Sequence, residues 1–219
     1  GTLFVNPGGP GASGRNLVTY FNSKGLEQYD IVGWDPRGTN ASTPVKCFND
    51  KQTDAFSALD ASPDDAAETD ALLIGTAEFA KSCWQNSGRL LQHISTVETV
   101  RDLDLMRELV DDRLLSFLGY SYGTQIGSYY ADLFPQRVGR LVLDAAVDIT
   151  DDDTVIQAMG FDLALGNFAA WCARQGCSLG SSKDAVLKST TDFLDRLDAA
   201  PVKVDGRVLG TITGDDFAS

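Results

Sequence analysis

Ser121 is the residue of this sequence best suited to act as a nucleophile. It stands in Gly119-Tyr120-Ser121-Tyr122-Gly123, which fits the pattern G-x-S-x-G. The pattern alone occurs by chance, but here an apolar segment (114–118) precedes it and a helix-forming segment (124–134) follows it. In a sharp strand-to-helix turn, side chains two positions on either side of the serine would collide with backbone, so glycine is needed there. We therefore predict that Ser121 attacks acyl carbonyl groups. The alternative is a glycine-rich turn without chemistry.

Acyl transfer also requires hydrogen-bond donors for the negative oxygen of the tetrahedral intermediate. One donor is expected to be the backbone N–H of Tyr122, because this residue directly follows the nucleophile. The second is expected from the glycine-rich segment 7–11, whose lack of side chains lets backbone approach a substrate. Within that segment we favour the N–H of Gly9, with Gly8 as the next candidate.

A charged pair follows the segment 29–34, which has the composition of a strand. Asp35 and Arg37 stand in Asp35-Pro36-Arg37-Gly38, where ligands of open parallel sheets gather at the carboxyl ends of strands. Charge-assisted hydrogen bonds from such a pair can brace the glycine-rich loop. We predict a supporting role for both residues and no direct part in the chemistry.

The base that would activate the serine is not evident in this sequence. A serine hydroxyl without a base is a weak nucleophile. The one histidine, His93, precedes Ser121, and we expect it on a loop or surface. Asp144 follows a strand-like segment and is one candidate for the triad acid. We expect the histidine in a further segment or a second chain. For the acid, a residue in that same segment is favoured over Asp144.

Strand-like and helix-like segments alternate through the first two thirds of the chain. Short apolar, β-branched runs predict strands, and apolar residues at helical spacing from Val97 to Val110 predict a helix that Thr96 or Thr99 would cap. Residues 49–90 are polar and helical in places. The predicted strands are 2–5, 29–34, 114–118 and 140–143, with further helices at 16–21 and 124–134. The alternation predicts an α/β fold, with a mostly parallel sheet flanked by helices.

The pattern changes after residue 148. Helix-like segments continue to Ala200 without a strand signal, so we predict a core at 1–148 and the start of a helical lid at 149–219. Asp151, Asp152 and Asp153 introduce the lid. They are candidates to hold the ammonium group of a peptide substrate, the alternative being aspartates that favour a helix N-terminus.

Composition excludes several classes of function. The chain has 219 residues and a net charge of −13, with 31 acidic against 18 basic residues. Nucleic-acid binding needs a basic face, so no nucleic-acid partner is expected. No apolar run reaches the ~20 residues that span a bilayer. Neither a cofactor nor a metal is predicted, because no phosphate loop or metal-ligand spacing is present. Asn40-Ala41-Ser42 fits the N-glycosylation pattern, but so short a pattern often occurs by chance and supports no inference.

The four cysteines fit two disulfides in an oxidising compartment. Four cysteines allow three connectivities, and we favour Cys47–Cys83 and Cys172–Cys177 because each pair lies within one local segment. Reduced thiols in the cytosol are the alternative. A zinc site is disfavoured, since it would need C-x-x-C spacing or more histidines.

Four motifs together resemble those of α/β-hydrolases, in the same order along the chain. They are Asn-Pro-Gly-Gly-Pro-Gly (6–11), Trp-Asp-Pro-Arg-Gly (34–38), Gly-Tyr-Ser-Tyr-Gly-Thr (119–124) and Arg-Leu-Val-Leu-Asp (140–144). The resemblance covers residues 1–150 and is greatest to the proline iminopeptidase and tripeptidyl aminopeptidase group. It implies a secreted serine hydrolase with a helical lid that cleaves near the free amino end of peptides. A carboxylesterase on the same fold and a non-catalytic binding protein are the alternatives.

Overall fold

A computed structural model describes residues 1–150, 154–199, 202–203 and 211–212. Contacts between Cα atoms divide the chain into two units, 1–57 with 75–152 and 58–74 with 153–219. The second unit begins close to the predicted boundary at 149. It also takes in 58–74, which the sequence analysis places in the core.

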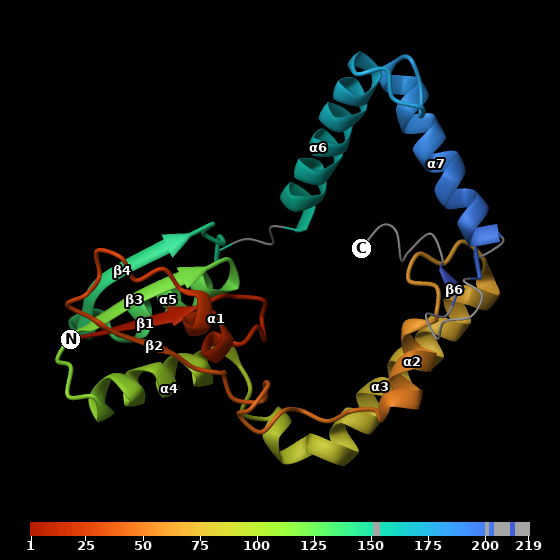
Figure 1. Cartoon of the computed structure of the whole chain (residues 1–219). Helices are drawn as coiled ribbons and strands as arrows, with labels where there is room; N and C mark the ends of the chain where they lie inside the picture. Colours follow the sequence, from red (N-terminus) through yellow and green to blue (C-terminus); the bar gives the residue numbers. More distant parts are fainter. Residues whose placement is uncertain (151–153, 200–201, 204–210, 213–219) are drawn as a thin grey trace. The chain divides into compact units, whose positions relative to one another are not determined.

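The first unit is built on a four-stranded parallel sheet (Figure 1). Its strands are β1 (Thr2–Asn6), β2 (Asp30–Gly33), β3 (Leu115–Tyr120) and β4 (Val138–Asp144), in the order β2-β1-β3-β4. The chain leaves β1 toward one side to form β2 and later returns on the other side as β3. Strand order therefore reverses between β1 and β3, and in open parallel sheets such a switch point is where ligand sites form.

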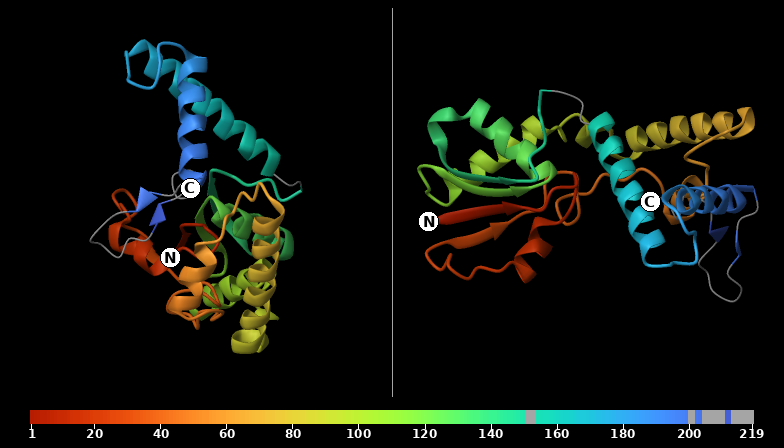
Figure 2. Two further views of the ribbon diagram at one scale, coloured as in Figure 1. Left: turned by 90° about the vertical axis from the view of Figure 1, so that its right-hand side faces the viewer. Right: turned by 90° about the horizontal axis from the view of Figure 1, so that it is seen from above.

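Helices cover both faces of this sheet (Figure 2). They are α1 (Gly14–Tyr20) on one face and α4 (Thr96–Leu109) and α5 (Tyr122–Leu133) on the other. The helices α2 (Asp50–Ser57) and α3 (Ala66–Leu91) follow β2 in the chain, and a short 3-10 turn at Pro135–Arg137 precedes β4. Phe4 and Phe117 pack with α4 and α5 on one face, whereas Leu3 and Val5 pack with α1 on the other. Side chains of a strand alternate between faces, so β1 is buried along its whole length. The α/β architecture expected from the sequence is confirmed.

The start of α4 differs from the prediction. Ser95 is the N-cap residue, and its Oγ accepts a hydrogen bond from the N–H of Glu98. Thr96 and Thr99 are therefore not the caps. Thr96 lies one residue inside the helix, and the Thr99 hydroxyl donates instead to the carbonyl of Ser95. Serine, followed by glutamate three residues later, is a typical helix start.

An ion-pair network is buried between α4 and α5. The Asp104 carboxylate accepts hydrogen bonds from the Nε of Arg107 at 3.0 Å and the phenol of Tyr130 at 2.9 Å, and Arg137 also contacts it. Burial opposes ionisation, but these donors and positive charges hold the pKa of Asp104 below its usual value. Burial, and then the hydrogen bond to Asp104, raise the pKa of Tyr130 to about 12.

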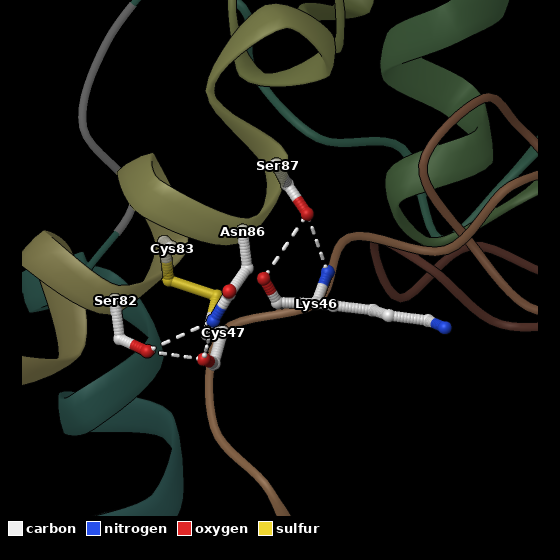
Figure 3. The surroundings of a disulfide bond; sticks show 6 residues. All are labelled: Lys46, Cys47, Ser82, Cys83, Asn86 and Ser87. Atoms are coloured by element: carbon white, nitrogen blue, oxygen red, sulfur yellow. Dashed lines mark hydrogen bonds between the residues drawn. A yellow bond between two sulfur atoms is a disulfide. The ribbon is translucent and has the colours of Figure 1, made fainter.

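A disulfide joins the loop after β2 to α3 (Figure 3). Around the Cys47–Cys83 bond, Ser82 and Asn86 donate to the carbonyl of Cys47, the latter at 2.8 Å. The Ser87 hydroxyl both accepts from Lys46 N and donates to Lys46 O. Close to Cys47 in the chain, the Phe48 ring contacts Phe56 and Phe79 edge to face, and the rings of Phe56 and Phe79 stack on each other. The loop is thereby fastened to α3 by covalent, polar and apolar contacts.

The second unit is mostly helical in its described residues. Its elements include α6 (Thr154–Arg174), α7 (Lys183–Ala199) and the antiparallel pair β5 (Val202–Lys203) and β6 (Thr211–Ile212). A disulfide between Cys172 and Cys177 closes the end of α6. Both disulfides thus join the pairs favoured from the sequence. Among the described residues, no helix has the length and apolarity to cross a membrane.

Candidate active site

Ser121 occupies the turn between β3 and α5 in a strained backbone conformation. Its φ of 52° and ψ of −125° lie in a region that L-residues rarely adopt. The backbone N–H of Ser121 donates to the carbonyl of Asp144 at the end of β4, at 2.9 Å. The side chain is exposed at the N-terminus of α5. The turn presents the hydroxyl to solvent above the carboxyl edge of the sheet.

The two flanking glycines are needed for close backbone contacts. A Cβ at Gly119 would lie 2.4 Å from the carbonyl oxygen of Gly123, and one at Gly123 would lie 2.8 Å from Oδ1 of Asn6. Both distances are shorter than van der Waals contact permits. The crowding expected from G-x-S-x-G is therefore present. Backbone of the turn itself crowds Gly119, and the end of β1 crowds Gly123.

Thr124 ties the serine turn to the chain that leaves β4. Its buried hydroxyl donates to the carbonyl of Ser121 at 2.6 Å and accepts from the N–H of Val147 at 2.9 Å. These bonds hold the positive-φ backbone at Ser121, and Ala145 nearby also has a positive φ of 57°. The sequence alone does not indicate this role of Thr124, since a threonine in the first turn of a helix is common.

The glycine-rich loop after β1 lies directly against the serine turn. A Cβ at Gly8 would lie 3.0 Å from both Cβ of Ser121 and the backbone nitrogen of Tyr122. The N–H of Gly8 donates to Oδ1 of Asn6 at 2.9 Å. Of the two candidates in this loop, Gly8 therefore has its N–H engaged, and Gly9 is left as the donor candidate. The expected neighbours of the nucleophile, Tyr122 and this loop, do come together.

The Asp35 carboxylate fastens the far end of the same loop. It accepts from the hydroxyl of Ser13 at 2.6 Å and from the N–H of Ala41 at 3.2 Å. Burial opposes its ionisation, but these hydrogen bonds and the charge of Arg15 hold the pKa of Asp35 below its usual value. Because Ser13 is also the N-cap of α1, Asp35 braces the point at which the loop becomes helix.

Comparison with known proteins agrees with this geometry. The family model described as alpha/beta hydrolase fold matches residues 1–209. The chain belongs to this family. It is 38% identical over 210 residues to serine protease Hip1 of Mycobacterium tuberculosis and 37% identical over 164 residues to tripeptidyl aminopeptidase of Streptomyces coelicolor. It is 34% identical over 217 residues to carboxylesterase B of M. tuberculosis.

These matches cover 90%, 72% and 93% of this α/β-hydrolase chain, respectively. They cover only 40%, 30% and 41% of the three relatives. The chain thus spans well under half the length of the relatives it matches.

In this α/β-hydrolase the Arg37 side chain bonds to α4 and to the residue His93 before it. It pairs with the Asp102 carboxylate on α4, through Nε at 2.6 Å and Nη2 at 2.5 Å, and Nη1 donates to the carbonyl of His93 at 3.0 Å. The hydrogen bond with Asp102, although partly offset by burial, raises the pKa of Arg37. Of the two residues expected to brace the glycine-rich loop, Asp35 does so, whereas the bonds of Arg37 among the described residues go to α4 and the residue His93 before it. Arg37 instead holds the start of α4, a partner 65 residues away in the sequence.

The titratable groups named as possible bases and acids are not joined to the nucleophile. His93 is exposed on the loop before α4, as expected. Asp144 is exposed and contacts the serine turn through its backbone carbonyl. Among the described residues, the Ser121 hydroxyl has no hydrogen-bond partner. Asp151, Asp152 and Asp153 lie outside the described residues.

One cluster of acidic side chains has the spacing of a metal site. The carboxylates of Asp64, Asp65 and Glu68 approach one another within 4.8 Å at the start of α3. Asp65 accepts from the N–H groups of Ala67 and Glu68, and Glu68 accepts from those of Asp64 and Asp65. These bonds cap the first turn of the helix. Capping accounts for the cluster without a metal.

Proposed function

We propose that this chain carries the nucleophile and oxyanion-binding groups of a serine hydrolase, and that the enzyme is an aminopeptidase releasing short N-terminal peptides. The observation that carries the proposal is the strained, exposed Ser121 at the sheet switch point, with Gly8 packed against it. Strain of this kind is costly and is found where function requires it. The names of the relatives support hydrolysis of amides or esters.

The residues act in one sequence of steps. The Oγ of Ser121 attacks the carbonyl carbon of the scissile bond, and its proton passes to a base. The N–H groups of Tyr122 and Gly9 donate to the oxygen that becomes negative, aided by the positive N-terminal end of α5. The carbon–nitrogen bond breaks as the amine takes up the proton, which leaves an acyl-enzyme on Ser121. Water then hydrolyses this ester and restores the serine.

The base is proposed to be a histidine that this sequence does not contain, oriented by an acid. The only histidine, His93, precedes Ser121 and is exposed, whereas the order in this fold is serine, acid, histidine. A further segment or a second chain would bring both residues to the exposed face of Ser121.

The preference for a free amino terminus is assigned to carboxylates at 151–153. An ammonium group needs a negative partner, and Asp151, Asp152 and Asp153 enter the helical unit close after β4 in the sequence. Replacing all three by asparagine is expected to raise KM for free-amine peptides and to leave N-acylated esters unaffected. Equal effects on both substrates would rule the assignment out.

Secretion is proposed for the same protein. The chain has two disulfides and no free cysteine, and structural disulfides persist in oxidising compartments. The measurement is export of the full-length protein with both bonds formed. Recovery from the cytosol with four free thiols would contradict the proposal.

The nucleophile is tested by labelling with a fluorophosphonate probe, read by peptide mass spectrometry, in the full-length protein and in its Ser121→Ala variant. We expect an adduct on Ser121 that the variant loses. An adduct on another residue, or none on folded protein, would overturn the catalytic proposal and favour a binding protein. Hydrolysis of a tripeptidyl anilide compared with a short-chain ester then separates the peptidase from the carboxylesterase.

A further inference from the structure

We propose that Asn40 is a positioning residue that holds the glycine-rich loop in its oxyanion-binding conformation. The inference rests on the proposed function, because it concerns the N–H of Gly9. Asn40 lies on the turn after β2, and its Nδ2 donates to the carbonyl of Gly11 at 2.7 Å. This is a direct side-chain bond between that turn and the middle of the loop.

The loop is closed on itself between Gly8 and Ala12. The N–H of Ala12 donates to the carbonyl of Gly8 at 3.2 Å, which encloses residues 9–11. Gly8 is fixed to β1 through Asn6, at 2.9 Å. Gly9 has a φ of 112°, and a Cβ there would lie 2.8 Å from the nitrogen of Gly11. The direction of the Gly9 N–H therefore depends on where Gly11 is held, and the Asn40 amide holds Gly11 by its carbonyl.

The turn that carries Asn40 is itself rigid. The N–H of Gly38 donates to the carbonyl of Ser42 at 3.1 Å, and the N–H of Ser42 donates to the carbonyl of Thr39 at 2.8 Å. The N–H of Ala41, the next residue, is bound by Asp35. Asn40 is thus presented by a frame with its own hydrogen bonds, so its amide acts on the loop from a fixed point.

Asparagine suits this position for two reasons. The φ of Asn40 is 41°, in the left-handed region that asparagine tolerates better than most residues. Its short amide supplies the donor that the Gly11 carbonyl accepts. This explains the asparagine without reference to the glycosylation pattern that it also fits.

The test compares Asn40→Gly with Asn86→Ala in the full-length protein. Glycine accepts the positive φ, so Asn40→Gly removes the donor without adding backbone strain. Asn86 makes the same kind of exposed bond, from its amide to the carbonyl of Cys47 at 2.8 Å, but on α3. The readouts are hydrogen exchange of the Ala12 amide, the maximal rate of fluorophosphonate labelling, and the probe concentration giving half that rate.

We expect Asn40→Gly to speed exchange at Ala12 and to slow the maximal labelling rate by about tenfold to a hundredfold, as misplacement of one donor does. The half-saturating concentration should stay unchanged, and Asn86→Ala should behave as the unaltered protein. Unchanged exchange at Ala12 would overturn the positioning role, whether or not the protein is active. Faster exchange with an unchanged labelling rate would separate Asn40 from the oxyanion site. An unaltered protein that does not label would refute the proposed function, and with it the catalytic consequence, while exchange still decides the contact.

Discussion

The phenol oxygen of Tyr122 lies 2.7 Å from the hydroxyl oxygen of Thr96. Tyr122 is the residue whose backbone N–H we assign to the oxyanion, and Thr96 is the first residue of α4. The bond joins the serine turn to the helix that Arg37 holds through Asp102. The side chain of the donor residue is thereby anchored on one side while its N–H remains beside Gly8.

Removing this bond is expected to cost about 1 kcal/mol of unfolding free energy, the usual net contribution of such a pair. We predict that Tyr122→Phe and Thr96→Ala each destabilise, and that the double variant is no worse than the more severe single one. The measurement is a double-mutant cycle by chemical denaturation. Strictly additive effects would mean that the two hydroxyls do not interact.

Gly123→Ala is predicted to destabilise the protein by more than about 2 kcal/mol, since overpacking against backbone has no inexpensive relief. The added methyl group would lie 2.8 Å from Oδ1 and 2.9 Å from the carbonyl oxygen of Asn6. Labelling of Ser121 should fall with it, because Asn6 also fixes Gly8.

Gly160→Ala is the matched control for this substitution. Gly160 lies within α6, and apart from the helix's own backbone no described residue comes within 4 Å of a Cβ placed there. Alanine is favoured over glycine inside a helix by about 1 kcal/mol, so stability should rise. A loss of stability at residue 160 equal to that at residue 123 would show that crowding is not the cause.

Asp104 should make stability fall in acid. Its folded-state pKa is lowered, so its contribution is complete above the unfolded-state value of about 3.9 and is lost as pH falls through the lower folded-state value. Asp104→Asn should remove this acid dependence. It should also destabilise the neutral protein by about 3–5 kcal/mol, because the buried charge of Arg107 loses its carboxylate partner.

The exposed pair of Lys188 and Asp192 provides the comparison. Asp192→Asn is expected to cost less than about 1 kcal/mol at neutral pH. The measurements are urea unfolding curves between pH 2 and pH 7. An acid dependence that persists in Asp104→Asn would assign it to other carboxylates.

Tyr130 should act at the opposite end of the pH range. Its pKa is raised to about 12, so its contribution is complete below the unfolded-state value of about 10 and is lost as pH rises toward the folded-state value. Tyr130→Phe should flatten stability between those two values. An identical alkaline decline in the variant would contradict this assignment.

The elements with strong local sequence patterns are the ones that can be located from the sequence. The run 2–5 is buried along its length because both sheet faces are covered there, and 114–118 alternates buried and half-buried residues. The serine turn is recognised in the sequence by its two glycines. The long helix α3 was predicted only as helical in places. Cys83 is its one buried residue in the described structure, so burial imposes little apolar periodicity on it.

The polar side chains that support the site could not be predicted from the sequence, for a different reason. Asn6 and Asn40 act through single hydrogen bonds from loop positions that carry no periodic pattern. Arg37 was expected to brace the glycine-rich loop together with Asp35, but its partner is Asp102, 65 residues away. Tertiary packing determines such pairings, so they cannot be read from the local sequence.

The two disulfides should differ in how much each stabilises the fold. Cys47 and Cys83 are 36 residues apart, whereas Cys172 and Cys177 are five apart. In the loop-entropy account, the longer loop is worth about 4 kcal/mol and the shorter one about 2 kcal/mol. Replacing each pair by serine and measuring the free energy of unfolding tests this difference. The bonds from Ser82 and Asn86 to Cys47 remain in the first variant, so the loop keeps its native position while the unfolded chain gains freedom. A larger loss from the Cys172–Cys177 pair would show that native contacts, and not loop length, set the contribution.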